Sequence, residues 1–127
     1  MRDCSIQLSN DPGDFARVAQ ALARRGVNIK AVAGLTVGGT AMARILPDDI
    51  VLARTALEAA NIRFTESEVH VVLLENKAGV LATVTGRLGD EGINLEAIYT
   101  TGVADDLVEL AIVSDNPKKA KKILEEY

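Results

Sequence analysis

The chain is poor in the residues that most enzyme chemistry requires. Its 127 residues include one histidine, one cysteine and no tryptophan, and only 3% are aromatic. A single cysteine excludes an intramolecular disulfide, and no cysteine–histidine cluster has the spacing of a metal site. Neither a phosphate-binding loop nor a dinucleotide fingerprint is present. We therefore expect a protein that is not an enzyme and that needs no cofactor or metal.

Long apolar runs and an excess of basic residues are also missing. No stretch approaches the length of a membrane span, and the N-terminus lacks the apolar core of a signal peptide. The net charge of −4 argues against a nucleic-acid partner. The lysine-rich segment 118–122 is interpreted as the solvated face of a final helix. We expect a cytoplasmic protein that binds neither nucleic acid nor a membrane.

The lone cysteine and the lone histidine both have structural interpretations. Cys4 lies in phase with Ile6 and Leu8 in a predicted strand, which favours a core position over a nucleophile. His70 lies at the join of two predicted strands, where a functional role is not favoured. Neither residue therefore indicates a catalytic site.

What the sequence does have is one stretch that occurs twice. Residues 10–32 align with residues 76–98 by a shift of 66 positions without a gap. Eight of the 23 aligned positions are identical, where chance gives roughly one or two. The identical pairs are Asn10/Asn76, Gly13/Gly79, Ala16/Ala82, Val18/Val84, Leu22/Leu88, Gly26/Gly92, Asn28/Asn94 and Ala31/Ala97. The repeat predicts two copies of one structural unit.

Each copy consists of a polar loop with a glycine, an amphipathic helix, and an exit in which glycine and asparagine alternate with apolar residues. In the first copy Asp11 is the predicted N-cap, and Pro12 suits the first helical position. The second copy has no proline there, so we expect Asn76 or Lys77 to start its helix. Gly26 and its counterpart are predicted to end the helices in the left-handed conformation.

The start of each repeated helix is a candidate binding site. Its backbone N–H groups point outward, and we expect them to lie close to the asparagine of the exit strand, Asn28 or Asn94. Such a site favours a carboxylate or another anion. The alternative is that Gly13 and Gly79 only relieve tight turns, while the asparagines only cap strand ends. The residues by themselves leave both interpretations open.

Both copies extend into larger units of the order strand, helix, strand, strand, helix, strand. The first unit has predicted strands at 4–8, 28–37, 41–46 and 61–65, with a second helix from 48–49 to about 60. The second unit has predicted strands at 69–74, 95–103 and 107–113, a hairpin one residue longer, and a last helix from Pro117, but no fourth strand. The fold class is α+β: two ferredoxin-like units, residues 1–68 and 69–127, each an antiparallel sheet with helices on one face.

The NDPG and NKAG loops at 10–13 and 76–79, and the GVNI and GINL exits at 26–29 and 92–95, resemble those of ACT domains. These domains are small regulatory modules of enzymes of amino-acid metabolism, and the chain looks like a free-standing tandem pair of them. The resemblance implies an amino acid bound at the first strand–helix loops between paired units. Backbone N–H groups would hold its carboxylate, and the asparagines its amino group or a neighbouring backbone. The implied contact residues are Asn10, Asp11, Pro12, Gly13, Asp14, Phe15, Asn28 and Ile29 in the first unit, and Asn76, Lys77, Ala78, Gly79, Val80, Leu81, Asn94 and Leu95 in the second.

Two functional hypotheses follow from this resemblance. The first is an amino-acid-binding regulatory protein, with the second loop as the better site because Lys77 is positive where the first loop has Asp11 and Asp14. The alternative is a regulatory subunit that controls an enzyme of amino-acid metabolism by contact, without binding a ligand. We also expect a homodimer, because the strand at 69–74 is apolar on both faces and lacks a neighbouring fourth strand.

Overall fold

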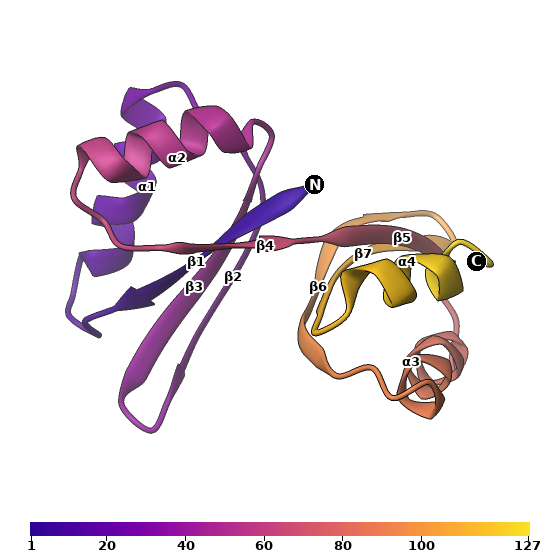
Figure 1. Cartoon of the computed structure of the whole chain (residues 1–127). Helices are drawn as coiled ribbons and strands as arrows, with labels where there is room; N and C mark the ends of the chain where they lie inside the picture. The colour runs from indigo at the N-terminus through magenta and orange to yellow at the C-terminus, as the bar shows by residue number, and fades with distance from the viewer. The chain divides into compact units, whose positions relative to one another are not determined.

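The computed structural model describes all residues from 1 to 127 as seven strands and four helices (Figure 1). They form two compact units, one of Arg2–Ser67 and one of Glu68–Tyr127 together with Met1. Each unit has its own sheet and its own hydrophobic core.

The first unit contains a four-stranded sheet with two helices on one of its faces (Figure 1). Its elements are β1 (Arg2–Leu8), α1 (Asp14–Arg24), β2 (Ile29–Val37), β3 (Thr40–Pro47), α2 (Ile50–Ala59) and β4 (Thr65–Glu68). The strand order is β2-β3-β1-β4, and β3 pairs antiparallel with both β1 and β2. The core lies between the sheet and the helices and includes Cys4, Ile6, Val18, Leu22, Ile45 and Leu57.

The second unit repeats this arrangement with one strand fewer. Its elements are β5 (His70–Glu75), α3 (Val80–Asp90), β6 (Leu95–Ala104), β7 (Leu107–Ser114) and α4 (Pro117–Leu124). The sheet order is β5-β7-β6, so β5 is an edge strand, whereas its counterpart β1 is central. Its core includes Val72, Leu74, Val84, Leu88, Ile112 and Leu124. The predicted fold class, including the absence of a fourth strand from the second unit, is confirmed.

The ends of the two repeated helices follow the prediction. After α1, Gly26 has a φ of 69° and its N–H donates to the carbonyl of Ala23, while the Val27 N–H donates to the carbonyl of Leu22. After α3, Gly92 has a φ of 73° and its N–H donates to the carbonyl of Gly89, while the Ile93 N–H donates to the carbonyl of Leu88. This pattern satisfies the last helical carbonyls and favours glycine, because a side chain is strained at positive φ.

The predicted starts of these helices are wrong by several residues. α1 begins at Asp14 rather than at Pro12, and its N-cap is Gly13 with a φ of 82°. The reason is a separate turn, in which the Asp14 N–H donates to the carbonyl of Asp11 at 3.2 Å. α3 likewise begins after Gly79, whose φ is 91°. A left-handed residue cannot continue a right-handed helix, so the loop lies before the helix in both units.

The predicted fourth strand of the first unit is also misplaced. It was expected at 61–65, whereas β4 spans Thr65–Glu68. Asn61 has a φ of 56°, and the Ile62 N–H donates to the carbonyl of Leu57, which ends α2 as a glycine ends α1. Asn61 can end α2 in this way because asparagine tolerates the left-handed conformation. The residues directly after it therefore belong to the end of the helix and not to the predicted strand.

The longer second hairpin is confirmed, and the structure locates its extra residue. The register between β6 and β7 shifts between Thr100 and Gly102, which leaves Thr101 as a bulge. The Thr101 hydroxyl donates to Glu109, with 2.7 Å between Oγ1 and Oε1. A bulge places one extra residue in a strand without disturbing the rest of the ladder, so the hairpins of the two units match apart from this position.

Candidate ligand-binding site

In the first unit, side chains at the two ends of the loop form hydrogen bonds with each other and with the backbone. The Asp14 carboxylate accepts hydrogen bonds from the backbone N–H of Ser9 at 2.7 Å and from the Ser9 hydroxyl at 2.9 Å. These bonds, together with that from Arg17 at 3.3 Å, lower the pKa of Asp14. The loop therefore carries a firmly ionised carboxylate at the start of α1. That charge disfavours a second carboxylate at the same place.

The loop of the second unit carries a different set of charges. Val80 stands at the position of Asp14, and Lys77 stands at the position of Asp11. Lys77 Nζ lies 3.0 Å from Glu75 Oε2, and these side chains are 70% and 65% exposed. An ion pair this exposed contributes little to stability. Both charges are thus exposed to solvent.

A groove of about 420 Å³ lies beside this second loop. It contains two of the residues expected at the site, Lys77 and Val80. Leu73 and Leu74, which also line it, are successive residues of β5 and therefore point to opposite faces of the sheet. Leu107 of β7, which also lines the groove, pairs with Glu75, so the groove lies at the end of β5 that leads into the loop. The full lining consists of Leu73, Leu74, Glu75, Lys77, Val80, Leu107 and Tyr127.

The two exit asparagines lie away from the loops of their own units. Asn28 precedes β2, whose first residue pairs with Pro47, whereas Asn10 contacts Thr36 at the other end of β2 through a hydrogen bond of 3.4 Å. Eight residues of strand separate the two ends by roughly 25 Å. The expectation that loop and asparagine lie close together within one unit is therefore wrong. β2 runs parallel to β1, so its start lies where α1 ends.

The asparagines have backbone roles at these positions. The carbonyl of Asn28 accepts from the Asp48 N–H at 3.0 Å, and the carbonyl of Asn94 accepts from the Asp115 N–H at the same distance. Asp115 Oδ1 in turn accepts from the Asn94 N–H. These bonds tie the start of the exit strand to the end of the following hairpin. The asparagine side chains are exposed.

Sequence reasoning missed several residues that line the groove. Glu75 could have been identified from the sequence, because it lies between the predicted strand at 69–74 and the loop. Leu107 and Tyr127 come from the hairpin and from the end of the chain, and no local pattern connects them with the loop. They reach the groove only through the pairing of Leu107 with Glu75 and the packing of α4 against β5.

The remaining reactive groups form no second site. Burial raises the pKa of the Cys4 thiol to about 11, so it is protonated and enclosed in the core, as the strand pattern predicted. Burial also lowers the pKa of His70, which keeps its imidazole neutral. No three histidine, cysteine or acidic side chains are grouped as metal ligands. None of the helices has the length and apolarity of a membrane span.

Comparison with known proteins identifies the fold family. Residues 71–127 match the family model of the ACT domain, and the second unit is an ACT domain. The first unit repeats the element order of this ACT domain, as the repeat indicated. No curated protein sequence matches the chain.

Several solved structures share the fold over almost the whole chain. A protein of Bacteroides thetaiotaomicron has 26% identity and a TM-score of 0.86, with 98% of this chain and 86% of that one covered. The regulatory subunit of aspartate kinase from Thermus thermophilus has 22% identity and a TM-score of 0.67, with 98% and 89% covered. The corresponding subunit from Thermus flavus has 20% identity and a TM-score of 0.66, with 98% and 90% covered.

Proposed function

We propose that this protein is a cytoplasmic, non-catalytic regulator that binds an amino acid through tandem ACT domains, residues 1–68 and 69–127. The observation that carries the proposal is the groove of about 420 Å³ beside the second loop. Its volume lies in the range of small-molecule sites. Its only cation, Lys77, is exposed and stands beside the start of α3, where a carboxylate is favoured.

The loops supply the proposed ligand contacts. The primary site consists of 76–81, with 10–15 as the weaker counterpart because of Asp14. The exit residues 28–29 and 94–95 complete the set. Since each asparagine lies at the far end of its own helix from the loop, a ligand that contacts both a loop and an asparagine takes them from different units. Such a ligand would lie between paired ACT units.

The proposed role is the regulation of an enzyme of amino-acid metabolism. Two proteins of similar fold are regulatory subunits of aspartate kinase, and this chain consists of the same kind of units. We propose that ligand binding changes how the protein contacts such an enzyme. If no amino acid binds, regulation of the enzyme by contact alone becomes the better hypothesis.

A pair of matched glycine variants tests the proposed site. Gly79 and Gly13 both have positive φ, and a Cβ added at either meets no atom within 4 Å. Valine therefore imposes similar backbone strain at both positions, but it blocks the approach of a ligand to a different loop in each variant. We expect Gly79→Val to abolish amino-acid binding and Gly13→Val to reduce it much less.

The measurement is a thermal-shift screen of the wild-type protein against the standard amino acids, followed by calorimetric titration of both variants. Circular dichroism verifies that each variant is folded. Equal loss of binding in two folded variants would refute the preference for the second loop, and a screen without any shift would refute amino-acid binding.

A further inference from the structure

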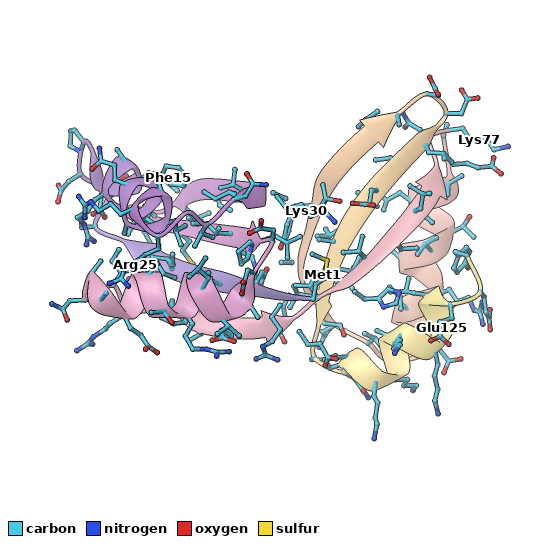
Figure 2. All side chains as sticks on the ribbon, turned by 90° about the horizontal axis from the view of Figure 1, so that it is seen from above. Met1, Phe15, Arg25, Lys30, Lys77 and Glu125 are labelled. Carbon is cyan, nitrogen blue, oxygen red and sulfur yellow. The ribbon has the colours of Figure 1, made fainter.

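The groove beside the second loop has a mostly apolar wall. Five of its seven lining residues are apolar or aromatic: Leu73, Leu74, Val80, Leu107 and Tyr127. Leu73 is 54% exposed, Tyr127 43% and Leu107 38%. These side chains come from β5, α3, β7 and the segment after α4, so residues of separate elements line one groove. Figure 2 labels Lys77, which lies in the loop between β5 and α3. Covering this exposed surface with an apolar group of a ligand is favourable, because it removes apolar area from water.

The charged part of the groove is a single pair of opposite sign. Glu75 and Lys77 are the only charged residues in the lining, and their side chains contact each other at 3.0 Å. An amino acid carries its ammonium and its carboxylate on the same carbon. Lys77 can therefore bind the ligand carboxylate while Glu75 binds the ligand ammonium. This exchange leaves every charge paired, which an anion or a cation alone does not.

The same lining disfavours a ligand whose charged side chain lies against it. Such a side chain lies against leucine, valine and tyrosine, and the lining offers it no third charge. Removing a charge from water without a partner is costly. A polar side chain such as that of serine leaves the apolar wall uncovered and gains little from it.

From these contacts we infer that the second unit binds an amino acid with an apolar side chain, and that the Glu75–Lys77 pair holds its ammonium and carboxylate groups. This inference rests on the proposed function and specifies the class of ligand. Leucine, isoleucine, valine and phenylalanine are the amino acids that fit the description.

The first unit lacks most of these features at the equivalent positions. Gln7 stands where Leu73 does, Ser9 where Glu75 does, Asp11 where Lys77 does, Asp14 where Val80 does and Thr40 where Leu107 does. At these five positions a polar residue or a reversed charge replaces a wall or head-group contact, whereas Leu8 keeps the apolar character of Leu74. Specificity for an apolar amino acid is therefore expected in the second unit alone, with one ligand bound per chain.

The ligand series for the test uses calorimetric titration of the intact protein. We expect leucine, isoleucine, valine or phenylalanine to bind and lysine, aspartate and serine to bind at least about ten-fold more weakly. N-acetyl-leucine lacks the ammonium and leucinamide lacks the carboxylate. Each is expected to bind at least about ten-fold more weakly than leucine, because each loses one charge-assisted contact.

Variants of groove residues test the two parts of the inference, which are the head-group contacts and the apolar specificity. Lys77→Met and Glu75→Gln are each expected to weaken leucine binding about ten-fold. Val80→Asp places the residue of the first unit at the start of α3 and is expected to abolish binding of apolar amino acids, while circular dichroism verifies that the variant is folded. The matched controls are Lys119→Met and Glu91→Gln, which break an exposed lysine–glutamate pair away from the groove. They should leave binding unchanged.

The outcomes separate this inference from the proposed function. If lysine, aspartate or serine binds best and Gly79→Val abolishes that binding, the proposed function stands and the apolar specificity is refuted. Absence of binding by any amino acid overturns both. If leucine binds equally well to Val80→Asp and Lys77→Met, the ligand lies elsewhere and the inference fails.

Discussion

Glu66 connects β4 to two other elements of the first unit. Its Oε2 accepts from Arg54 Nε at 2.6 Å, and its Oε1 accepts from Arg54 Nη2 at 2.9 Å and from Arg2 Nε at 3.0 Å. These hydrogen bonds, those from Arg54 above all, lower the pKa of Glu66 from 4.5 to about 2. One carboxylate thus joins the start of β1 and the outer surface of α2 to the short strand β4.

The stability of the first unit should therefore depend on the charge of Glu66. Its pKa is lower in the folded than in the unfolded protein, so its contribution is complete above pH 4.5 and is lost as pH falls towards 2. We expect Glu66→Gln to lower the free energy of unfolding by about 1–2 kcal/mol at neutral pH, since the pair is partly screened by solvent. Urea unfolding at pH 7 and at pH 3 measures this, with Asp48→Asn as control. An equal loss at both pH values would contradict the assignment.

At the scale of elements, two helices are capped by the side chain that precedes them. Asp49 Oδ1 accepts from the Leu52 N–H at 3.0 Å at the start of α2, and Asn116 Oδ1 accepts from the Lys119 N–H at 3.2 Å at the start of α4. The other two helices have no such cap, because a left-handed glycine precedes them. Their first N–H groups accordingly have no side-chain partner within the unit.

The N-terminal cap of α2 leads to a testable prediction about the stability of the protein. Asp49→Ala removes the acceptor for the Leu52 N–H and should destabilise the protein by about 1 kcal/mol. Asp48→Ala is the matched control, because the neighbouring Asp48 carboxylate does not cap the helix. Thermal unfolding of the two variants provides the comparison. A smaller effect of Asp49→Ala than of Asp48→Ala would show that the cap is not formed in solution.

Elements with a strong local pattern could be predicted from the sequence, and their boundaries could not. The stripes of Val18 and Leu22, and of Val84 and Leu88, located α1 and α3 because only one face of each helix is buried. The starts of these helices were misjudged because Pro12 suits either a first helical turn or a separate loop. Which of the two forms depends on the left-handed conformation of the next residue, and glycine allows both.

The candidate site was predictable only where it is local. The loop 76–81 could be found from its repeat, and Lys77 from its charge. The apolar wall depends on Leu107 and Tyr127, which approach β5 only after the strands pair and α4 packs. The separation of each asparagine from its loop likewise follows from the direction of β2 relative to β1, which a linear motif does not contain.

At the scale of the whole molecule, β5 is an edge strand without protection. It pairs with β7 on one side only, and β4 belongs to the sheet of the first unit. Its segment between His70 and Glu75 contains no proline, bulge or internal charge. Protein sheets usually avoid such edges or cover them, because their free N–H and C=O groups attract another strand.

The faces of β5 indicate what covers this edge. Val72 and Leu74 are buried under the helices, as the repeat predicted, while Leu73 on the opposite face is 54% exposed. A second copy of the chain can pair its β5 antiparallel with the first about Val72, which places Val71 opposite Leu73 of the other copy on that face. We therefore predict a homodimer in which two three-stranded sheets form one continuous sheet.

Light scattering across micromolar concentrations tests the dimer. We expect Val71→Glu and Leu73→Glu each to shift the protein to a monomer, because two carboxylates then lie within an apolar patch. Val71 does not line the groove, so its variant separates dimerisation from ligand binding, which Leu73→Glu cannot do. Val51→Glu is the control, because Val51 is 62% exposed on α2 and lies outside β5. A wild-type protein that is monomeric at every concentration would refute the dimer, and a monomer produced by Val51→Glu as well would show that β5 is not its basis.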